Sequence, residues 1–445
     1  MVPPIIASAS TPKASTGISN SKETIMIDRP PNNIMYIDLN SCFATIEQQS
    51  RPMLRGRPVG ISNRITPNAC VIAASYEAKA HGVKVGMRRA EAEMLCPNIV
   101  FVETEPDKYI FVHQKLRAIM EDYSPIVVMK SIDEGVLDLN QSPAHIRQRP
   151  HAELAQEIKD RLRTEIGCWM RCNIGVASNR FLAKTAAELH KPDGFDEITA
   201  TNQRQIFANL KLMDLPGINT RMQARLNAVG IFTPLQLLDA DEETLVKMVC
   251  HSIDGSKWYK RLRGLEVDDW VSDIKSIGRQ YVLEGKHLTK DDIYARIMHL
   301  SEDVGYRLRS KERYARGVYV WAYTYDGLYL HRAHLGKTAF NTDQDITQIA
   351  RQLFADFPAP LQIIGITLYK IQTAPDAQLS FNQAAIDAQE NLCLAADTIN
   401  LRFGSRTIHY ADSCGTDHVK TKIPFGSTRY LDHSITWPRH RLMLI

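Results

Sequence analysis

Two short apolar runs, each followed by acidic residues, constrain the fold of this chain more than any other feature. Residues 34–37 are Ile, Met, Tyr and Ile, and the run ends on Asp38. Residues 126–129 are Ile, Val, Val and Met, and Asp133 and Glu134 come shortly afterwards. Short apolar runs bounded by polar residues are typical of buried strands. The sequence therefore predicts two core strands with carboxylates at their ends.

Strand and helix patterns alternate through the first part of the chain and predict one α+β domain. Residues 71–74 and 173–177 have the pattern of strands, whereas 151–166 and 181–190 have helical periodicity. The pattern from 201 to 263 is helical throughout, which predicts a separate helical module.

A change in composition marks the start of a further domain. The acidic stretch 266–273 gives way to basic residues from Lys275, as expected at a linker. Asp326 and Gly327 form the signature of a hairpin turn. After a first strand from about 275, the expected elements are a helix at 289–313, strands at 317–325 and 328–335, a helix at 343–356 and a strand at 362–371.

Length and composition set the broad class. The 445 residues are too many for one core and predict roughly two to four domains. The net charge of +4 is compatible with a nucleic-acid partner without requiring one. The eight cysteines show no disulfide or zinc-ribbon spacing, and no apolar run reaches the ~20 residues of a membrane helix, so we expect a cytoplasmic protein without a membrane segment.

The three acidic residues suggest a metal site. Asp38, Asp133 and Glu134 would converge if their strands are neighbours in one sheet. Hard oxygen ligands suit Mg²⁺, which can bind substrate phosphates at the same time. Two such ions about 3.5–4 Å apart stabilise the attacking and leaving oxygens of a phosphoryl displacement. Phosphoryl or nucleotidyl transfer is the chemistry that follows from such a site. Acidic residues at strand ends are commonly just solvated turn residues, so the spacing alone leaves both interpretations open.

Several motifs, in order along the chain, resemble those of the Y-family DNA polymerases of the DNA polymerase IV and UmuC type. They are DLNSCFATIE at 38–47, YEAKAHGV at 76–83, SIDE at 131–134, NRFLAK at 179–184 and KPDG at 191–194. Each motif is short, but their shared order and spacing make the resemblance specific.

The resemblance implies an α+β, right-hand polymerase with palm, fingers, helical thumb and a C-terminal little-finger domain. The expected boundaries are 1–31 for a disordered leader, 32–42 and 105–194 for the palm, 43–104 for the fingers, 195–265 for the thumb, 266–274 for a linker, 275–372 for the little finger and 373–445 for a C-terminal extension.

The implied reaction is template-directed addition of deoxynucleotides to a primer 3′-OH, at low fidelity and for bypass of damaged template. The expected partners are primer–template DNA and dNTP, the cofactor is a pair of Mg²⁺ ions, and the chain is expected to be a monomer. Two alternatives stay open: a catalytically inactive, polymerase-like DNA-binding accessory protein, and a nucleotidyl cyclase.

The resemblance also implies roles for individual residues. Asp38 and Asp133 would bridge both metals, Glu134 would hold the catalytic metal, and the backbone carbonyl of Leu39 would complete the nucleotide-metal site. Phe43 falls at the steric gate that excludes a ribose hydroxyl, although a core Phe on a helix is the alternative.

Further positions match substrate and DNA contacts. Tyr76, Lys79 and Lys191 match residues that contact the triphosphate. The turn at Gly217 resembles a helix-hairpin-helix that binds a DNA phosphate through backbone amides, and Asn219 takes the place of its second Gly because Asn tolerates left-handed geometry. In the last domain we expect the strand-end set Lys275, Ser276 and Arg279 to grip the duplex.

Some positions depart from the family pattern. Lys79 stands where many relatives have Arg, and Asn40 replaces a frequent second Asp. Ala73 occupies a position that often carries a hydroxyl, and Gly135 and Val136 follow the acidic pair where Ala and an aromatic residue are usual. These departures leave the nucleotide preference open.

The C-terminus weakly resembles a clamp-binding peptide. Residues 439–445 read RHRLMLI, a run of apolar residues after a polar stretch, without the expected Gln. The sequence therefore suggests docking on a sliding clamp, and a terminal strand packed on its own domain is the alternative.

Overall fold

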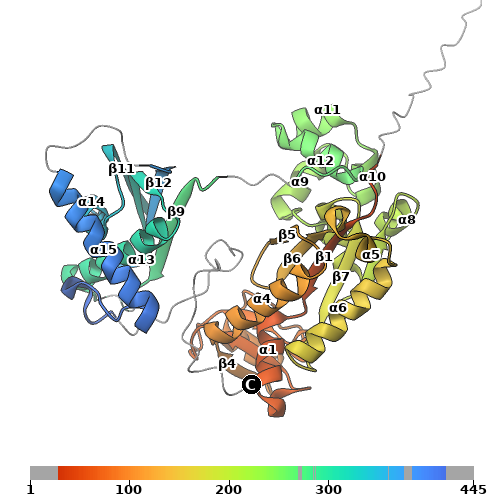
Figure 1. Ribbon diagram of the computed structural model, residues 1–445, viewed down its shortest axis with the longest axis horizontal. Coiled ribbons are helices and arrows are strands. Elements are labelled where there is room, and N and C mark those ends of the chain that lie inside the picture. The colour runs from red at the N-terminus through yellow and green to blue at the C-terminus, as the bar shows by residue number, and fades with distance from the viewer. Residues whose placement is uncertain are drawn as a thin grey trace, which may run out of the picture.

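The computed structural model describes residues 29–268, 273–283, 285, 287–358, 360–374 and 383–416. These residues form three sheets with their helices and one helical module (Figure 1). No helix within these ranges is both long enough and apolar enough to cross a membrane.

A five-stranded sheet forms the centre of the larger part. Its strand order is β5 (Val127–Met129), β6 (Glu134–Asp138), β1 (Ile34–Leu39), β7 (Cys172–Ala177) and β8 (Phe195–Ile198). The central strand β1 is antiparallel to both β6 and β7, whereas β7 and β8 are parallel.

Helices cover both faces of this sheet, because its strands are apolar on both sides. Met35 and Ile37 of β1 share a core with α4 (Pro106–Glu121) and α6 (His151–Glu165). Tyr36 of β1 belongs to the second core, with α7 (Arg180–Leu189). The segments α1 (Cys42–Ser50), η2 (Leu139–Gln141) and α5 (Ala144–Arg147) complete this layer.

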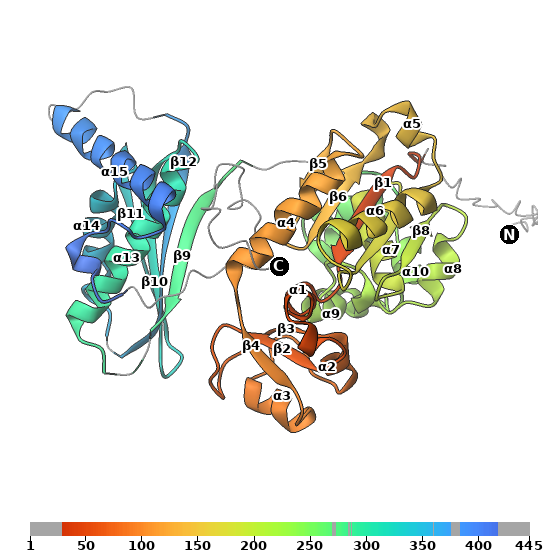
Figure 2. The same cartoon turned by 60° about the horizontal axis from the view of Figure 1, so that its bottom comes forward.

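A small domain is inserted between β1 and α4. Its sheet has the order β3 (Val71–Ala74), β2 (Val59–Ser62) and β4 (Val100–Glu103). It carries η1 (Pro52–Leu54), α2 (Tyr76–Ala80) and α3 (Arg89–Leu95), and Figure 2 shows it below the larger sheet.

A helical module follows β8. It consists of α8 (Gln203–Ala208), η3 (Leu212–Asp214), α9 (Thr220–Ala228), α10 (Pro234–Asp239), α11 (Glu242–Thr244), the π-helical segment η4 (Leu245–Cys250) and α12 (Asp254–Leu262). Its apolar residues share the second core with α7, so it packs directly on the larger sheet domain.

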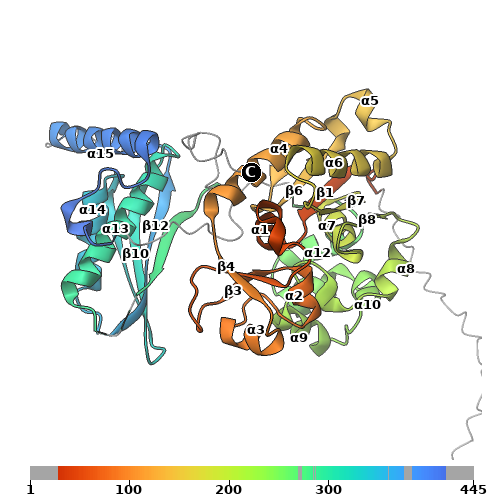
Figure 3. The same ribbon diagram turned by 90° about the horizontal axis from the view of Figure 1, so that it is seen from below.

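The C-terminal domain is a four-stranded sheet with helices on one side (Figure 3). Its elements follow in the order β9 (Ser276–Val282), α13 (Lys290–Arg309), β10 (Tyr314–Thr324), β11 (Tyr329–Phe340), α14 (Asp343–Phe354) and β12 (Leu361–Gln372). The strand order is β11, β10, β12, β9, and all pairs are antiparallel.

A buried arginine attaches the following segment, α15 (Gln383–Phe403) and η5 (Ala411–Ser413), to this domain. The Arg309 side chain is only 2% exposed; its Nη1 lies 2.7 Å from Asp343 Oδ1, and its Nε lies 2.6 Å from Asp397 Oδ2 on α15. Burial raises the pKa of Asp343 to about 6 although Arg309 opposes this shift. Arg309 at the end of α13 therefore holds α14 and α15 through ion pairs with Asp343 and Asp397.

Most of the expected elements are present, with shifted ends. The expected helix at 289–313 is shorter and ends at Arg309, because Glu312 has a left-handed φ of 51° and Tyr314 already belongs to β10. The expected strand at 328–335 is longer and continues to Phe340. Gly327 has a φ of 89° in the β10–β11 turn, in agreement with the expected hairpin.

Arg29, within the leader expected at 1–31, contacts the folded chain: its guanidinium donates to Ser178 Oγ and Gln203 Oε1, each at 2.8 Å. One expectation was wrong in detail. Asn219 is extended rather than left-handed, with φ −100°, and its side chain caps α9 by accepting from Met222 N at 2.9 Å. Residues 1–28 and 417–445, with the proposed clamp-binding peptide, lie outside the described residues.

Replacing Arg309 by Ala is expected to destabilise the C-terminal domain by about 3–5 kcal/mol, because the buried Asp343 and the partly buried Asp397 lose their partner. Hydrogen exchange of the full chain should show faster exchange in α13, α14 and α15. Arg402→Ala, which removes an exposed arginine from α15, serves as the control. Unchanged protection in Arg309→Ala would contradict a structural role of this network.

Candidate functional site

Strand pairing brings the three acidic residues to one end of the five-stranded sheet. In the register of β1, Asp38 lies opposite Glu134 of β6 and opposite Asn173 of β7. The backbone N–H of Leu39 donates to the carbonyl of Asp133 at 2.9 Å. Asp38 and Glu134 therefore lie at paired positions of the neighbouring strands β1 and β6, next to the backbone of Asp133. The strand predicted at 126–129 is β5, which pairs with β6 and not with β1.

Asp38 is electrostatically the most perturbed of the three. Burial raises its pKa to about 7, the charges of Glu188 and Asp133 add to this effect, and Lys191 opposes it. Lys191 Nζ lies 3.1 Å from Asp38 Oδ2 and 2.9 Å from Glu188 Oε1. Burial lowers the pKa of Lys191, but these two carboxylates raise it overall. Asp38 thus sits where a nearby positive charge is strongly favoured.

The neighbouring carboxylates have partners of their own. Burial raises the pKa of Asp133, the Ser131 hydroxyl that donates to it lowers it, and the charge of Glu134 raises it further. Lys184 Nζ on α7 donates to Glu134 Oε2 at 2.6 Å. Sequence analysis gave Lys184 no role, although it stands in the NRFLAK motif.

This group has the chemistry of a site for a hard cation. Its ligands are oxygen atoms on rigid strand ends, which suits Mg²⁺. Burial and mutual repulsion raise the pKa of Asp38 and Asp133, and a cation would relieve both. Within the described residues, no group of three or more His, Cys, Asp or Glu side chains has the arrangement of a formed metal site. The oxygen ligands of Asp38, Asp133 and Glu134 fit a divalent ion. Here Lys191 is paired with Asp38, Ser131 with Asp133 and Lys184 with Glu134.

Tyr76, Lys79 and Lys191 lie together beside Asp38. Lys79 Nζ is 4.8 Å from the centre of the Tyr76 ring and donates to Ser41 Oγ at 2.8 Å. Burial lowers the pKa of Lys79, and the charge of Lys191 lowers it further. Lys79 and Lys191 thus bring two interacting ammonium groups near Asp38, which favours a bound anion.

Phe43 is buried on α1 and fixed by an aromatic neighbour. Its ring stacks on Tyr109 of α4, with centroids 4.1 Å apart and planes 11° from parallel. The Tyr109 hydroxyl donates to Glu47 Oε1 at 3.0 Å, and Lys108 Nζ lies 3.1 Å from Glu47 Oε2. Sequence analysis missed Tyr109 because it is distant in the chain and belongs to none of the motifs.

Asn40, which departs from the family pattern, connects the end of β1 to the segment that carries Lys191. Its side chain is buried; Nδ2 donates to Asn173 Oδ1 at 3.0 Å and Oδ1 accepts from Asp193 N at 2.8 Å. An Asp could not make both bonds, since a carboxylate has no donor.

Comparison with known proteins identifies the family. The sequence pattern of the impB/mucB/samB family matches residues 37–188, and that of its C-terminal domain matches residues 274–381. The chain is 32% identical over 396 residues to DNA polymerase IV of Moorella thermoacetica, covering 86% of this chain and 96% of that relative. The chain belongs to the Y family of DNA polymerases.

Further matches agree with the Y-family assignment. DNA polymerase IV 1 of Bacillus subtilis is 28% identical over 401 residues, which cover 87% of this chain and 95% of that one. A solved Y-family DNA polymerase chimera of Dbh and Dpo4 has a TM-score of 0.66 at 23% identity, and the match covers 77% of this chain and 99% of that chain. The fold is thus the expected right hand, with the five-stranded sheet as palm, the inserted sheet as fingers, the helical module as thumb and the C-terminal sheet domain as little finger.

The remaining candidate residues of this Y-family chain lie in the thumb and the little finger. Gly217 has a left-handed φ of 87° in the turn before α9, as the expected hairpin requires. Lys275 and Ser276 are exposed at the start of β9. Arg279 pairs with the buried Ile366 of β12 and its Nε lies 2.9 Å from Asp303 of α13, so it belongs to the helix side of the sheet. Ser276 is three residues from Arg279 on β9, so the two side chains lie on opposite faces of the sheet.

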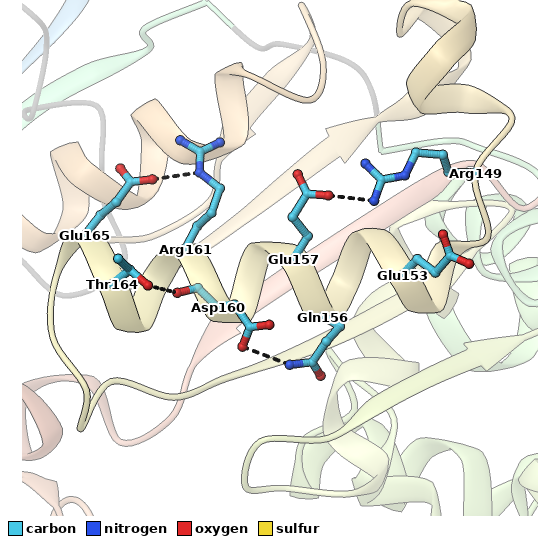
Figure 4. Close-up of a pocket in the computed structure, with 8 residues that line it drawn as sticks. All are labelled: Arg149, Glu153, Gln156, Glu157, Asp160, Arg161, Thr164 and Glu165. Atoms are coloured by element: carbon cyan, nitrogen blue, oxygen red, sulfur yellow. Dashed lines mark hydrogen bonds and ion pairs between the residues drawn. The ribbon is translucent and has the colours of Figure 1, made fainter.

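A surface pocket lies along α6, and none of Asp38, Asp133 and Glu134 lines it (Figure 4). Arg149 Nη2 lies 2.6 Å from Glu157 Oε2, and Arg161 Nε lies 2.7 Å from Glu165 Oε1. Arg149 precedes α6 and the other lining residues belong to it, and the printed ion pairs join them to one another, so this pocket is part of the solvated surface of α6. Its lining residues are Arg149, Glu153, Gln156, Glu157, Asp160, Arg161, Thr164 and Glu165.

Proposed function

We propose that this Y-family chain is a template-directed DNA polymerase that adds deoxynucleotides to a primer 3′-OH, at low fidelity and on damaged templates. The observation that carries this proposal is the register of β1 against β6, which places Asp38 opposite Glu134 and beside Asp133 at the end of the palm sheet. Relatives named DNA polymerase IV that align along most of the chain support the same reaction.

Three carboxylates and one carbonyl are our candidates for holding the metal ions. Asp38 and Asp133 would contact two ions, Glu134 one of them, and the carbonyl of Leu39 would complete the set. Two Mg²⁺ ions supply stabilisation of the attacking and leaving oxygens in a phosphoryl displacement.

The basic residues beside Asp38 are our candidates for holding the triphosphate. Lys79 and Lys191 each place an ammonium group near Asp38, and Tyr76 supports Lys79 through its ring. Lys binds phosphate as a point charge, without the bidentate geometry that Arg would provide. Lys79 therefore holds the phosphates by charge, with less control over their orientation.

We assign the selection of the sugar to Phe43. Phe43 lies in the first turn of α1, five residues after Asp38, and its ring stacks on Tyr109, which donates a hydrogen bond to Glu47. A ring held on its rear face by a second ring cannot move aside for an additional hydroxyl. The buried position also fits an ordinary core role, and substitution distinguishes the two.

The DNA contacts that we propose are phosphate contacts. Backbone amides at the Gly217 turn, together with Lys275 and Ser276 at the start of β9, can bind phosphates without reading sequence. Arg279 contributes less to this set than expected, because it is paired with Asp303 on the helix side.

The two alternatives predict different behaviour in one assay. An inactive accessory protein would bind primer–template DNA without extending it, and a nucleotidyl cyclase would convert a nucleoside triphosphate without a template. The retained Asp38, Asp133 and Glu134 argue against the first, and the thumb and little finger argue against the second. Primer extension with Mg²⁺ and dNTP distinguishes all three.

Asp133→Asn and Glu134→Gln should each lower primer extension by several orders of magnitude, because a neutral amide holds a divalent ion poorly. DNA binding, measured by fluorescence anisotropy, should persist. Glu153→Gln, an exposed change on α6, is the matched control and should extend normally. Substantial extension by the Asp133 and Glu134 double variant would refute the metal assignment.

Phe43→Ala should admit ribonucleotides, because the space that the ring occupies becomes free for a 2′-OH. We expect discrimination between dNTP and rNTP to fall roughly tenfold or more while dNTP addition continues. Steady-state kinetics with both substrates measures the ratio, and Phe232→Ala, which removes a ring that is 59% exposed in the thumb, is the control. An unchanged ratio would return Phe43 to a purely structural role.

The peptide at 439–445 remains a candidate for tethering to a sliding clamp. Tethering raises the effective concentration of the polymerase at the primer end without any new catalytic contact. Deleting residues 442–445 should therefore reduce clamp-stimulated extension and leave clamp-free extension intact. Equal loss of both activities, or no loss of either, would exclude the tether.

A further inference from the structure

Two buried asparagines lie between the end of β1 and residues 190–194, the segment that carries Lys191 and that we call the lysine loop. Asn173 of β7 is directly opposite Asp38 in the register of β1, and Asn40 follows Asp38 by two residues. Asn173 is 0% exposed and Asn40 is 1% exposed. Asn40 Nδ2 donates to Asn173 Oδ1 at 3.0 Å, so the two side chains form one buried amide pair.

This amide pair holds three backbone groups of the lysine loop. Asn173 Nδ2 donates to the carbonyl of His190 at 3.1 Å, and Asn173 Oδ1 accepts from Gly194 N at 3.2 Å. Asn40 Oδ1 accepts from Asp193 N at 2.8 Å. The loop is therefore held by its backbone at both of its ends.

The geometry of the loop needs such support. Asp193 has a left-handed φ of 61°, a conformation that is costly for a residue with a side chain unless surrounding contacts hold it. A Cβ at Gly194 would lie 2.1 Å from the carbonyl oxygen of His190, so the chain turns back too closely for any other residue. Lys159 of α6 adds a bond from the other side, because its Nζ donates to the carbonyl of Asp193 at 2.5 Å.

The two side chains use both the donor and the acceptor capacity of an amide. A carboxylate of the same shape has no donor, and an aliphatic side chain has neither a donor nor an acceptor. Satisfying buried backbone groups is the ordinary role of a buried asparagine. That role explains the bonds, but the backbone groups that Asn40 and Asn173 satisfy all belong to the loop that carries Lys191.

The loop places an ammonium group at the end of β1. Lys191 Nζ lies 3.1 Å from Asp38 Oδ2 and 2.9 Å from Glu188 Oε1 of α7. The Lys191 side chain is 24% exposed, so a ligand can still reach it. Because lysine has a flexible four-carbon stem, the position of its ammonium group depends on how firmly its backbone is held.

We propose that Asn40 and Asn173 are positioning residues for nucleotide binding: they hold the lysine loop so that Lys191 faces the triphosphate of the incoming dNTP beside Asp38. This role rests on the proposed polymerase function, which gives Lys191 a triphosphate to bind. Neither asparagine needs to contact the nucleotide. Each acts through the backbone of the loop, so its effect on nucleotide binding must disappear when the lysine side chain is removed.

Single-turnover primer extension separates nucleotide binding from chemistry. Asn173→Ala and Asn40→Ala should raise the apparent Kd for dNTP roughly 5- to 20-fold, because the loop loses bonds that hold its ammonium group in place. The maximal rate should fall by less than about threefold. Primer–template affinity, measured by fluorescence anisotropy, should stay unchanged. Gln156→Ala, which removes an exposed amide from α6 of the palm, is the control and should match the wild-type chain in all three measurements.

A double-mutant cycle with Lys191→Ala distinguishes positioning from a general structural role. Lys191→Ala should itself raise the Kd for dNTP, and adding Asn173→Ala should change that Kd by less than about twofold, since the asparagine acts through the lysine. A purely structural asparagine would lower the free energy of unfolding and the maximal rate, and its effect would add to that of Lys191→Ala. Additive effects, or an unchanged Kd for dNTP in both asparagine variants, would overturn the proposal.

Hydrogen exchange tests the loop itself without nucleotide or metal. The amides of Asp193 and Gly194 should be protected in the wild-type chain. They should exchange roughly tenfold faster or more in Asn40→Ala and Asn173→Ala, respectively, because each amide loses its acceptor. Far-UV circular dichroism and thermal unfolding identify any variant that fails to fold. Unprotected amides in the wild-type chain would overturn the proposal even if neither variant folds.

The same measurements distinguish this role from the proposed function. A wild-type chain that does not extend a primer would refute the polymerase function, and the positioning role would fall with it. A wild-type chain that extends a primer, with asparagine variants that bind dNTP equally well, would refute only the positioning role.

Discussion

The antiparallel pairing of β1 with β6 and β7 is the constraint on which the rest of the site depends. A shift of this register by one residue would turn Glu134 of β6 to the opposite face of the sheet from Asp38 of β1. The register is strongly specified because β1 is apolar on both faces and each face packs against helices. The position of the carboxylates therefore depends on the packing of the whole palm.

The buried carboxylates of Asp38 and Asp133 lower the stability of the palm when they are charged. Burial raises the pKa of Asp38 and Asp133, which means that their charged forms are disfavoured in the fold. Lys191 and Lys184 offset part of this repulsion from α7 and the segment after it. A site that is unfavourable alone and favourable with cations is what metal and triphosphate binding require.

The sequence was most informative where chemistry coincides with local structure. Asp38 could be predicted at a strand end because the apolar run at 34–37 stops before it, and the run at 126–129 pointed to the turn that precedes Glu134 at the start of β6. The Asp326–Gly327 turn has its own signature. Tyr109 could not be predicted as the support of Phe43, because their contact joins distant segments of the chain. Arg279 was placed with Ser276 by proximity along the chain, whereas the pairing of β9 with β12 puts them on opposite faces.

The two faces of the little-finger sheet differ in what they contact. The helix side of the sheet is occupied by α13 and α14, and the network around Arg309 fixes α15 to that layer. Charged residues on this side form ion pairs. Arg279 pairs with Asp303. Arg309 pairs with Asp343 and Asp397. The rings on the other side, Tyr319, Trp321, Tyr323, Tyr329 and His331, contact one another across β10 and β11 instead.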